Sequence, residues 1–370
     1  MDSAVRIAVV GAGVIGRTHV ETLGRMAPRG EVRLSAIVDP MPAGRALAAG
    51  LGVPAFDDAE ALVEAGAADA AIVATPNETH LPLTAALIGA GLPVLLEKPV
   101  AESLQAARAL VALQARLGVP VLVGHHRRSN PIVARAREAI AAGEIGDLVM
   151  ASVTTSLAKP AAYFDMAWRR SPGAGGPLLI NLIHEIDMLR HFFGEIVSVQ
   201  AIVSNAQRGF AVEDGAAVAL RFAGGGLGTV AISDAAAGPW AWDLTAGENP
   251  GRFPAHPVSA HHYAGSRGGL SLPDLTLWRH DGPTDGPPDW TRPMRSERLT
   301  AAATDAYEAQ IAHFADLVTG RADHPRVSLA DGTANLAVIE AIRTAGATGR
   351  VAEVDLSGLT AADACVAAHG

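Results

Sequence analysis

The sequence predicts an α/β protein of two domains, the first built on a parallel sheet and the second on an antiparallel one. Its 370 residues exceed the length at which a single hydrophobic core usually stops growing. In the first third, short β-branched apolar runs alternate with helical segments, which is the pattern of a parallel sheet. Further along, strand-length runs follow one another across short glycine-rich links, which is typical of antiparallel hairpins.

The composition narrows the class of protein. Apolar residues make up 49% of the chain and aromatic residues only 4%, so small side chains are expected to pack the layers closely. A formal net charge of −9 argues against a surface that binds nucleic acid. No apolar run reaches the roughly 18 residues of a membrane span, and the N-terminus lacks the basic region and cleavage site of a signal peptide. We therefore expect a cytoplasmic protein. The single cysteine, Cys365, excludes an internal disulfide and cannot by itself build a cysteine metal site.

The first predicted strand, Val5 to Val10, leads directly into the glycine motif GAGVIG at residues 11–16 and then into a helix. Gly11 permits a tight turn, Gly13 lets the backbone approach a pyrophosphate, and Gly16 allows close packing of helix on strand. The helix N-terminus then faces the phosphates. This context predicts the Rossmann fold of a dinucleotide-binding domain.

The second predicted strand, Val32 to Val38, ends at Asp39. An acidic residue at this place accepts hydrogen bonds from the adenosine ribose hydroxyls. Because it also repels a 2′-phosphate, Asp39 favours NAD over NADP as the cofactor. The alternative interpretation is a turn or cap residue before Pro40.

Two of the next three predicted strands, at 67–75, 92–96 and 119–123, end in polar motifs. Thr75-Pro-Asn-Glu-Thr-His80 follows the first of them and Glu97-Lys98-Pro99 follows the second. Open α/β sheets bind ligands at this carboxyl edge, so a lysine there indicates a function more than a solvated charge. The predicted cofactor-binding residues are Gly11, Gly13, Val14, Ile15, Gly16, Asp39, Thr75, Pro76, Asn77, His80, Glu97 and Lys98.

The stretch from Gly175 to Gly194 predicts a helix with a polar stripe opposite a wide apolar arc. At about 100° per residue the stripe contains four side chains: Asn181, His184, Asp187 and His191. A surface helix with an exposed polar face and a helix with a functional face both fit this pattern. Further strands are predicted at 148–155, 197–204, 216–222, 226–233, 240–245, 269–272 and 275–279, and helices at 306–319 and 330–344.

The motifs GAGVIG, TPNETH, EKP and GG…H..D, in this order, resemble the Gfo/Idh/MocA family, the group of glucose–fructose oxidoreductase and inositol dehydrogenase. The resemblance runs over nearly the whole chain. It implies a Rossmann domain with a doubly wound parallel sheet at 1–125, an α/β domain with a large, mostly antiparallel sheet at 126–350, and a tail at 351–370. It also implies a homodimer or homotetramer, a cis peptide bond before Pro99, contact of Lys98 with the nicotinamide ribose and the substrate hydroxyl, and His184 as the catalytic acid/base.

The chain departs from this family at one position. Inositol dehydrogenase-like members have an aspartate four residues before the histidine, and this chain has Ile180 there. Residues four apart on a helix are neighbours, so that aspartate would lie beside the imidazole. Asn181 and Asp187, each three residues from His184, are the two candidates for orienting it.

Several residues of the second half are candidates for substrate contact. The segment after the last Rossmann strand contains Arg127 and Arg128, and the segment before the central helix contains Tyr163, Trp168 and Arg169. For Trp168, packing is an alternative. Residues 248–268 predict an irregular loop that covers the substrate, with histidines at 256, 261 and 262 and a tyrosine at 263; their spacing does not favour a metal, and none is expected.

Together these observations predict NAD-dependent oxidation of a secondary hydroxyl on a cyclic polyol, sugar or sugar acid. Lys98, His184 and Asn181 are the predicted catalytic residues, and His184 suits proton transfer because a histidine pKa lies near 6.5. The predicted substrate-binding residues are Arg127, Tyr163, Trp168, Arg169, Asn181 and His184. Two alternatives stay open: an enzyme that retains its NAD and acts through transient oxidation, leading to elimination, hydrolysis or isomerisation, and a non-catalytic NAD-binding regulator.

Overall fold

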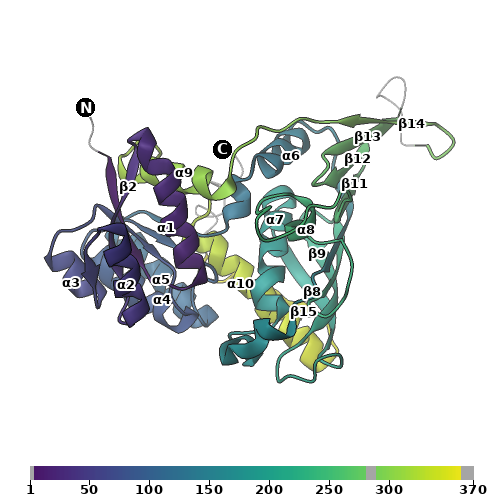
Figure 1. Ribbon diagram of the computed structural model, residues 1–370. Helices are drawn as coiled ribbons and strands as arrows, with labels where there is room; N and C mark the ends of the chain where they lie inside the picture. The colour runs from purple at the N-terminus through teal and green to yellow at the C-terminus, as the bar shows by residue number, and fades with distance from the viewer. Residues whose placement is uncertain (1–3, 281–288, 360–370) are drawn as a thin grey trace. The chain divides into compact units, whose positions relative to one another are not determined.

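The computed structural model describes residues 4–280 and 289–359, so Cys365 lies outside the described residues. The chain divides into two compact units (Figure 1). Of the described residues, the first unit comprises 4–129, 304–336 and 357–359, and the second comprises 130–280, 289–303 and 337–356. The division is thus not a single cut, because a segment near the C-terminus completes the first unit. Within the described residues, no helix is long and apolar enough to cross a membrane.

The first unit contains a six-stranded parallel sheet with the order β3-β2-β1-β4-β5-β6. This order confirms the predicted Rossmann fold, and it reverses between β1 and β4, where such sheets bind their ligands. β1 is almost completely buried, as expected for a strand covered on both faces. The strands are β1 Val5–Val10, β2 Val32–Val38, β3 Ala55–Phe56, β4 Ala70–Val73, β5 Val94–Leu96 and β6 Val121–Val123.

Helices connect these strands, and several begin at the residue types that stabilise helix N-termini. Asp58 accepts a hydrogen bond from Ala61 N at 2.8 Å, and Ser103 accepts one from Ala106 N at 3.2 Å. Figure 1 shows the early helices packed around this sheet. The helices of the first unit are α1 Val14–Met26, α2 Pro42–Leu51, α3 Ala59–Glu64, α4 His80–Gly89, α5 Leu104–Leu117 and α9 Ala306–Val318, with 3₁₀ turns at Ala27–Arg29, Asn77–Thr79 and His126–Ser129.

The second unit contains a nine-stranded sheet with the order β14-β13-β12-β11-β7-β10-β9-β8-β15. All neighbours are antiparallel except β7 and β10, which confirms a mostly antiparallel sheet. The strands are β7 Leu148–Ser156, β8 Ile196–Ser204, β9 Gly215–Phe222, β10 Leu227–Ser233, β11 His261–Gly265, β12 Gly268–Leu272, β13 Thr276–His280, β14 Met294–Arg298 and β15 Ala352–Glu353.

Helix α7 (Ile183–Phe193) packs on one face of this sheet, as Figure 1 shows. Its Phe193 meets Tyr263 and Phe222 edge-on, at ring distances of 5.0 and 6.0 Å. The other helices of this unit are α6 Pro131–Ala141, α8 Trp242–Thr245 and the second half of α10 Leu329–Thr348, whose first half belongs to the first unit.

Two predictions for the second half were wrong. The stretch 240–245 is not a strand, because its centre forms the short helix α8 around the fully buried Trp242; a short apolar run does not distinguish the two. The segment around His261 is not an irregular loop, because His261–Gly265 forms β11. Its histidine and tyrosine are buried and alternate with exposed neighbours, a two-residue period hidden by polar side chains.

Candidate active site

The glycine turn after β1 is held by close backbone contacts. Gly11 has a positive φ of 95°, and a Cβ there would lie 2.7 Å from the Ala74 oxygen. A Cβ on Gly16 would lie 1.9 Å from the Gly11 oxygen. In contrast, nothing lies within 4 Å of a Cβ placed on Gly13. Two glycines thus serve packing, while the third leaves open space beside the backbone.

This open space fits a dinucleotide. Gly13 is the N-cap of α1 and no side chain caps the helix there, so the first N–H groups of α1 are available to phosphate oxygens. Asp39 lies beside the turn: its Oδ2 accepts from Ala12 N at 2.7 Å and its Oδ1 from Met41 N at 2.8 Å. The turn role considered for Asp39 is therefore present. Because each carboxylate oxygen accepts more than one hydrogen bond, it leaves room for ribose hydroxyls.

His80 links the segments after β4 and β5. Its buried ring lies 2.9 Å from the Thr75 carbonyl through Nε2 and 2.7 Å from the Pro99 carbonyl through Nδ1. Burial lowers the pKa of His80 more than these two contacts raise it. A neutral imidazole donates to only one of the two carbonyls. The ring therefore ties two stretches of this edge together, and its contact with a cofactor stays a prediction.

Glu97 forms a buried pair with His19, which sequence reasoning missed. Its Oε1 lies 2.8 Å from His19 Nε2, and its Oε2 accepts from Lys98 N at 3.3 Å. Burial raises the pKa of Glu97. The hydrogen bond and the charge of His19, together with the charges of Lys98 and His126, lower this pKa by more than burial raises it, so it lies below its ordinary value. The carboxylate thus anchors the backbone immediately before Lys98.

Lys98 itself is half-buried, and the bond to Pro99 is cis, as the resemblance implied. We call the carboxyl ends of β1, β2, β4 and β5, with their motifs, the cofactor edge. Arg127 and Arg128 belong to the same unit but are almost fully buried. Arg128 lies 3.5 Å from Asp331 and donates to the Arg326 carbonyl, so it holds the fold.

In the second unit, the glycine-rich segment before the central helix is shaped by two close contacts. A Cβ on Gly175 would lie 2.3 Å from the Arg169 oxygen, and one on Gly176 would lie 2.1 Å from Glu213 Oε1. The same Glu213 oxygen accepts from Leu178 N at 3.1 Å and so caps the helix. Burial raises the pKa of Glu213. Because these two positions carry no Cβ, the Glu213 carboxylate can approach the first turn of the helix.

The helix begins with a π turn over Leu178–Leu182 and continues as α7. A π turn contains an extra residue, so the 100° spacing assumed for the whole stretch fails at its start. Asn181 lies within the π turn, and His184 lies in the first turn of α7. π turns frequently occur at functional sites.

The polar stripe is not an exposed face. Asp187 is 1% exposed, His184 is 8% exposed, and Asn181 and His191 are half-buried. The surface-helix interpretation is therefore wrong. The roles of His184 in catalysis and of Asp187 in orienting it stay predictions.

Glu185, also on α7, forms a second buried pair that the sequence did not reveal. Its Oε2 lies 3.1 Å from His261 Nε2, and the other ring nitrogen of His261 lies 2.8 Å from the Tyr263 hydroxyl. Both members of the pair are at most 1% exposed. These contacts lie between α7 and β11, at the residue after His184.

Lys159, which no motif singled out, contacts the predicted catalytic Asn181. Its Nζ donates to Asn181 Oδ1 at 2.8 Å and lies 3.5 Å from Asp234 Oδ2. Asp234 also accepts from Arg208 Nε at 2.9 Å. The Lys159 side chain is 8% exposed. It lies just after β7, where a lysine in a loop gives no signal of its own.

Tyr163 lies beside two cations. Lys159 Nζ is 4.7 Å from the centre of its ring and Arg169 Cζ is 4.0 Å from it. Arg169 also donates to the Tyr163 carbonyl at 2.6 Å and lies 5.3 Å from the ring of Trp168, which is 43% exposed and thus not a core side chain. Burial raises the pKa of Tyr163. We call Lys159, Arg169 and Arg208 the cationic cluster.

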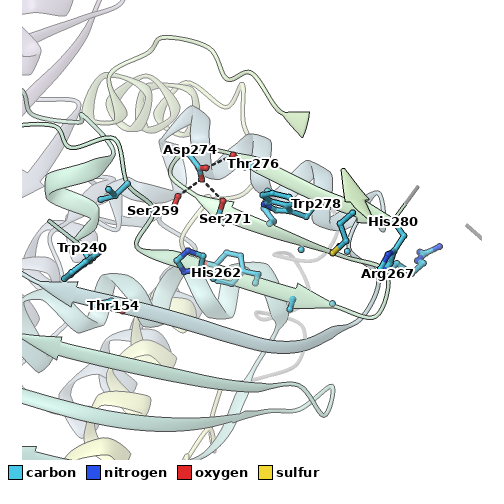
Figure 2. A pocket seen from close by; sticks show the side chains of 18 residues that line it. Thr154, Trp240, Ser259, His262, Arg267, Ser271, Asp274, Thr276, Trp278 and His280 are labelled. Atoms are coloured by element: carbon cyan, nitrogen blue, oxygen red, sulfur yellow. Dashed lines mark hydrogen bonds between the residues drawn. The ribbon is translucent and has the colours of Figure 1, made fainter. Parts of the chain in front are cut away.

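A separate groove of about 1110 Å³ lies on the large sheet (Figure 2). Figure 2 shows Ser259, Ser271 and Thr276 converging on Asp274; these hydroxyls donate to its carboxylate and lower its pKa despite burial, which raises it. The carboxylate is satisfied locally and stiffens the β12–β13 turn. In the part of the chain that the structure describes, no three His, Cys, Asp or Glu side chains gather as metal ligands.

Comparison with known proteins identifies the family. A family profile described as "Oxidoreductase family, NAD-binding Rossmann fold" matches residues 5–125, and one described as "GFO/IDH/MocA C-terminal domain" matches residues 133–248. The chain is 34% identical to the rhizopine catabolism protein MocA of Rhizobium meliloti over 191 residues, which are 51% of this chain and 57% of that protein. It is 31% identical to an inositol 2-dehydrogenase of Corynebacterium glutamicum over 211 residues, 54% of this chain and 58% of that protein. The chain thus aligns with little more than half the length of each.

A solved structure shows that the fold is shared beyond the aligned parts. Levoglucosan dehydrogenase in complex with NADH superposes with a TM-score of 0.78 at 20% identity, covering 95% of this chain and all of that one. The two matching profiles and this fold agree with the parallel sheet of the first unit and the large sheet of the second. The chain therefore belongs to the Gfo/Idh/MocA oxidoreductase family, and its first unit is the NAD-binding domain of that family.

Proposed function

We propose that the protein is an NAD-dependent dehydrogenase that reversibly oxidises a secondary hydroxyl of a cyclic polyol, sugar or sugar acid. The observation that carries the proposal is the segment Glu97-Lys98-Pro99 at the cofactor edge. There the buried Glu97–His19 pair holds the backbone that presents a half-buried lysine, at the same sheet edge as the open glycine turn. The name of one relative, an inositol 2-dehydrogenase, supports a cyclic hydroxylated substrate.

In the proposed reaction three side chains act on the substrate. NAD, when bound, accepts the hydride that leaves the carbinol carbon. Lys98 donates a hydrogen bond from Nζ to the hydroxyl oxygen, and His184 takes the hydroxyl proton on an imidazole nitrogen. Asn181 positions the substrate or the imidazole, and Asp187 orients His184. Asp39 favours NAD because a carboxylate repels a 2′-phosphate.

The remaining parts of the proposal follow the sequence predictions. Arg127, Tyr163, Trp168 and Arg169 contact the substrate. The protein acts in the cytoplasm as a homodimer or homotetramer.

The test is NAD reduction over inositols, aldoses, uronates and cyclic diol acids. Lys98→Ala and His184→Ala are each expected to abolish turnover while NADH still binds, because they remove the groups on the reacting oxygen and leave the glycine turn intact. His191→Ala, on the same helix, is the control and is expected to retain turnover.

Near-normal turnover in the His184 variant would contradict the assignment. Product formation without net NADH would instead indicate an enzyme that retains its NAD. Tight NAD binding without turnover of any substrate would indicate a regulator.

A further inference from the structure

We propose that Lys159 is a positioning residue of the dehydrogenase: it holds the Asn181 amide so that the NH₂ group donates a hydrogen bond to the reacting oxygen of the substrate. This inference rests on the dehydrogenase function proposed above. It decides between the two tasks left open for Asn181, which are contact with the substrate and orientation of the His184 imidazole.

Lys159 is held in place by its backbone and by its side chain. Its N–H donates to the Asp234 carbonyl at 2.8 Å, and its carbonyl accepts from Arg208 Nη2 at 3.0 Å. Its Nζ lies 3.5 Å from Asp234 Oδ2 and 4.7 Å from the centre of the Tyr163 ring. The side chain is 8% exposed. Lys159 is therefore a buried and anchored donor whose ammonium faces groups of the protein.

The contact with Lys159 sets the orientation of the Asn181 amide. Lys159 Nζ donates to Asn181 Oδ1 at 2.8 Å. A lysine ammonium has only donors, so a flipped amide would lose this bond and place its NH₂ group against the N–H groups of the ammonium. The Asn181 amide is thus restricted to one of its two orientations, with Nδ2 directed away from Lys159.

The NH₂ group of Asn181 is open to a ligand. Among the described residues it meets no acceptor, while Asn181 is half-buried and its Nδ2 is not enclosed. The side chain therefore offers donors to a ligand, because its oxygen already accepts from Lys159. The aspartate absent at Ile180 would offer only acceptors.

The backbone that carries Asn181 is fixed as well. Asn181 lies in the π turn Leu178–Leu182, and Glu213 Oε1 accepts from the first N–H of this turn at 3.1 Å. His184 follows in the first turn of α7. Asn181 and His184 are thus three residues apart in one continuous helical stretch, where residues at this spacing are neighbours.

The imidazole of His184 is a poor partner for this donor. The ring nitrogen that takes the substrate proton has to be free of other donors, and the second nitrogen of a neutral ring carries a hydrogen and donates itself. After proton transfer both ring nitrogens donate. An NH₂ group directed at the ring would therefore oppose the reaction.

The reacting oxygen is the better partner. When His184 takes the hydroxyl proton, negative charge grows on this oxygen until the hydride leaves the carbon and the C=O bond forms. An N–H group already aimed at the oxygen stabilises this charge without reorganising first. Asn181 makes the contact, and Lys159 supplies the aim.

The experiment measures NAD reduction by the full-length protein and its variants. The substrate is the fastest of the inositols, aldoses, uronates and cyclic diol acids, a panel that includes myo-inositol, D-glucose, D-glucuronate and quinate. Lys159→Met removes the ammonium, Asn181→Ala removes the amide, and the double variant shows whether the two residues act as one unit. Lys159→Arg retains a donor. Arg221→Met is the control, because Arg221 is exposed on β9 and forms no ion pair with a described residue.

Asn181→Ala and Lys159→Met are each expected to lower kcat about 10- to 100-fold, the effect of losing one hydrogen bond to a developing charge. KM should change less than about threefold, because the bond is strongest in the transition state. The double variant should be no slower than Asn181→Ala alone, since Lys159 acts through Asn181. Lys159→Arg should keep more of kcat than Lys159→Met, and Arg221→Met should keep all of it.

Normal kcat in Lys159→Met would overturn the inference. Losses that multiply in the double variant would do the same, because Lys159 would then act on its own. Asn181→Asp keeps an acceptor for Lys159 and lacks the NH₂ group, so it tests the inference even where Lys159→Met does not fold. Its kcat is expected to fall as far as that of Asn181→Ala, and wild-type kcat in this variant would contradict the donor role.

The wild-type protein separates the two proposals. If it reduces NAD with at least one compound of the panel while Lys159→Met is unaffected, the dehydrogenase is supported and the role of Lys159 is overturned. If it reduces NAD with none of them, the dehydrogenase is overturned, and the role of Lys159 with it.

Discussion

The cofactor edge of the first unit and the cationic cluster of the second use their polar side chains in opposite ways. At the cofactor edge, His19 and Glu97 pair with each other, and His80 contacts two backbone carbonyls. In the cationic cluster, one carboxylate serves two cations, and Arg169 has no carboxylate partner among the described residues.

This difference distinguishes polar groups that stabilise the fold from polar groups that are available to bind a ligand. A buried polar group that is already paired stabilises the fold, and its removal leaves a partner unsatisfied. A polar group without an internal partner contributes little to stability and is available for a ligand. We therefore expect substitutions at the paired residues His19, Glu97 and His80 to act on unfolding. Substitution of Arg169, which has no carboxylate partner among the described residues, is expected to act mainly on ligand affinity.

The largest effect is expected at Glu97. Glu97→Gln removes the charged partner of His19 in a buried pair, which typically costs about 3–5 kcal/mol. The pKa of Glu97 lies below its ordinary value of 4.5, so its stabilisation is present above pH 4.5 and is lost as the pH falls through the folded-state pKa. The variant should lack this part of the acid sensitivity.

Hydrogen exchange of the peptides covering β1 and α1 measures this effect, while tryptophan fluorescence reports only on the second unit, because all five tryptophans lie between residues 168 and 290. Glu64→Gln, an exposed carboxylate on α3, is the control. If the Glu97 variant were as stable as this control, the Glu97–His19 pair would not stabilise the first unit, and the prediction would be wrong.

A second internally hydrogen-bonded group of the first unit, His313, predicts that the stability of this unit depends on pH. His313 is buried on α9, and its Nε2 accepts from Arg326 N at 3.0 Å, which requires a neutral ring. Burial, with the charge of Arg326, lowers its pKa to about 4. Between pH 6.5 and 4 only the unfolded chain binds the proton, so up to about 3 kcal/mol of stability is lost as the pH falls.

Unfolding of the first unit at pH 7, 5.5 and 4, followed by hydrogen exchange, checks this expectation. His313→Gln is the matched variant, because its amide oxygen can still accept from Arg326 and does not titrate. The loss of stability between pH 6.5 and 4 should be smaller in the variant. Identical pH dependence in both proteins would show that His313 is not held neutral.

The parts of the fold and of the candidate site that could be predicted from the sequence are those with a local sequence pattern. β1 and β2 were predicted to the residue, and the cofactor edge was predicted as a set, because a strand, a glycine turn and a strand-end motif are each local patterns. The π turn at Leu178–Leu182 has no comparable local signature, so the spacing of the polar stripe was predicted on the wrong helix geometry.

The pairs that position the candidate site were not readable. His19 and Glu97 are 78 residues apart, and Lys159 and Asn181 are 22 apart on a loop and a helix. Nothing near either residue in the sequence indicates its partner, because such contacts are created by the packing of distant segments. A signal did exist for His19, a histidine among the buried positions of α1, and it would have indicated burial without naming Glu97.

The smallest effect is expected at Tyr163, and it tests the comparison within one unit. Tyr163→Phe removes a hydroxyl that bonds to no described residue and keeps the ring beside both cations, so the free energy of unfolding should change by less than about 0.5 kcal/mol. Tyr263→Phe is the matched change, because its buried hydroxyl lies 2.8 Å from His261 Nδ1; this variant should lose about 1–3 kcal/mol. Urea unfolding followed by tryptophan fluorescence measures both. If Tyr163→Phe lowered the free energy of unfolding as much as Tyr263→Phe, the Tyr163 hydroxyl would have an internal partner. The polar groups beside the Tyr163 ring would then be paired within the protein, as His19 and Glu97 are.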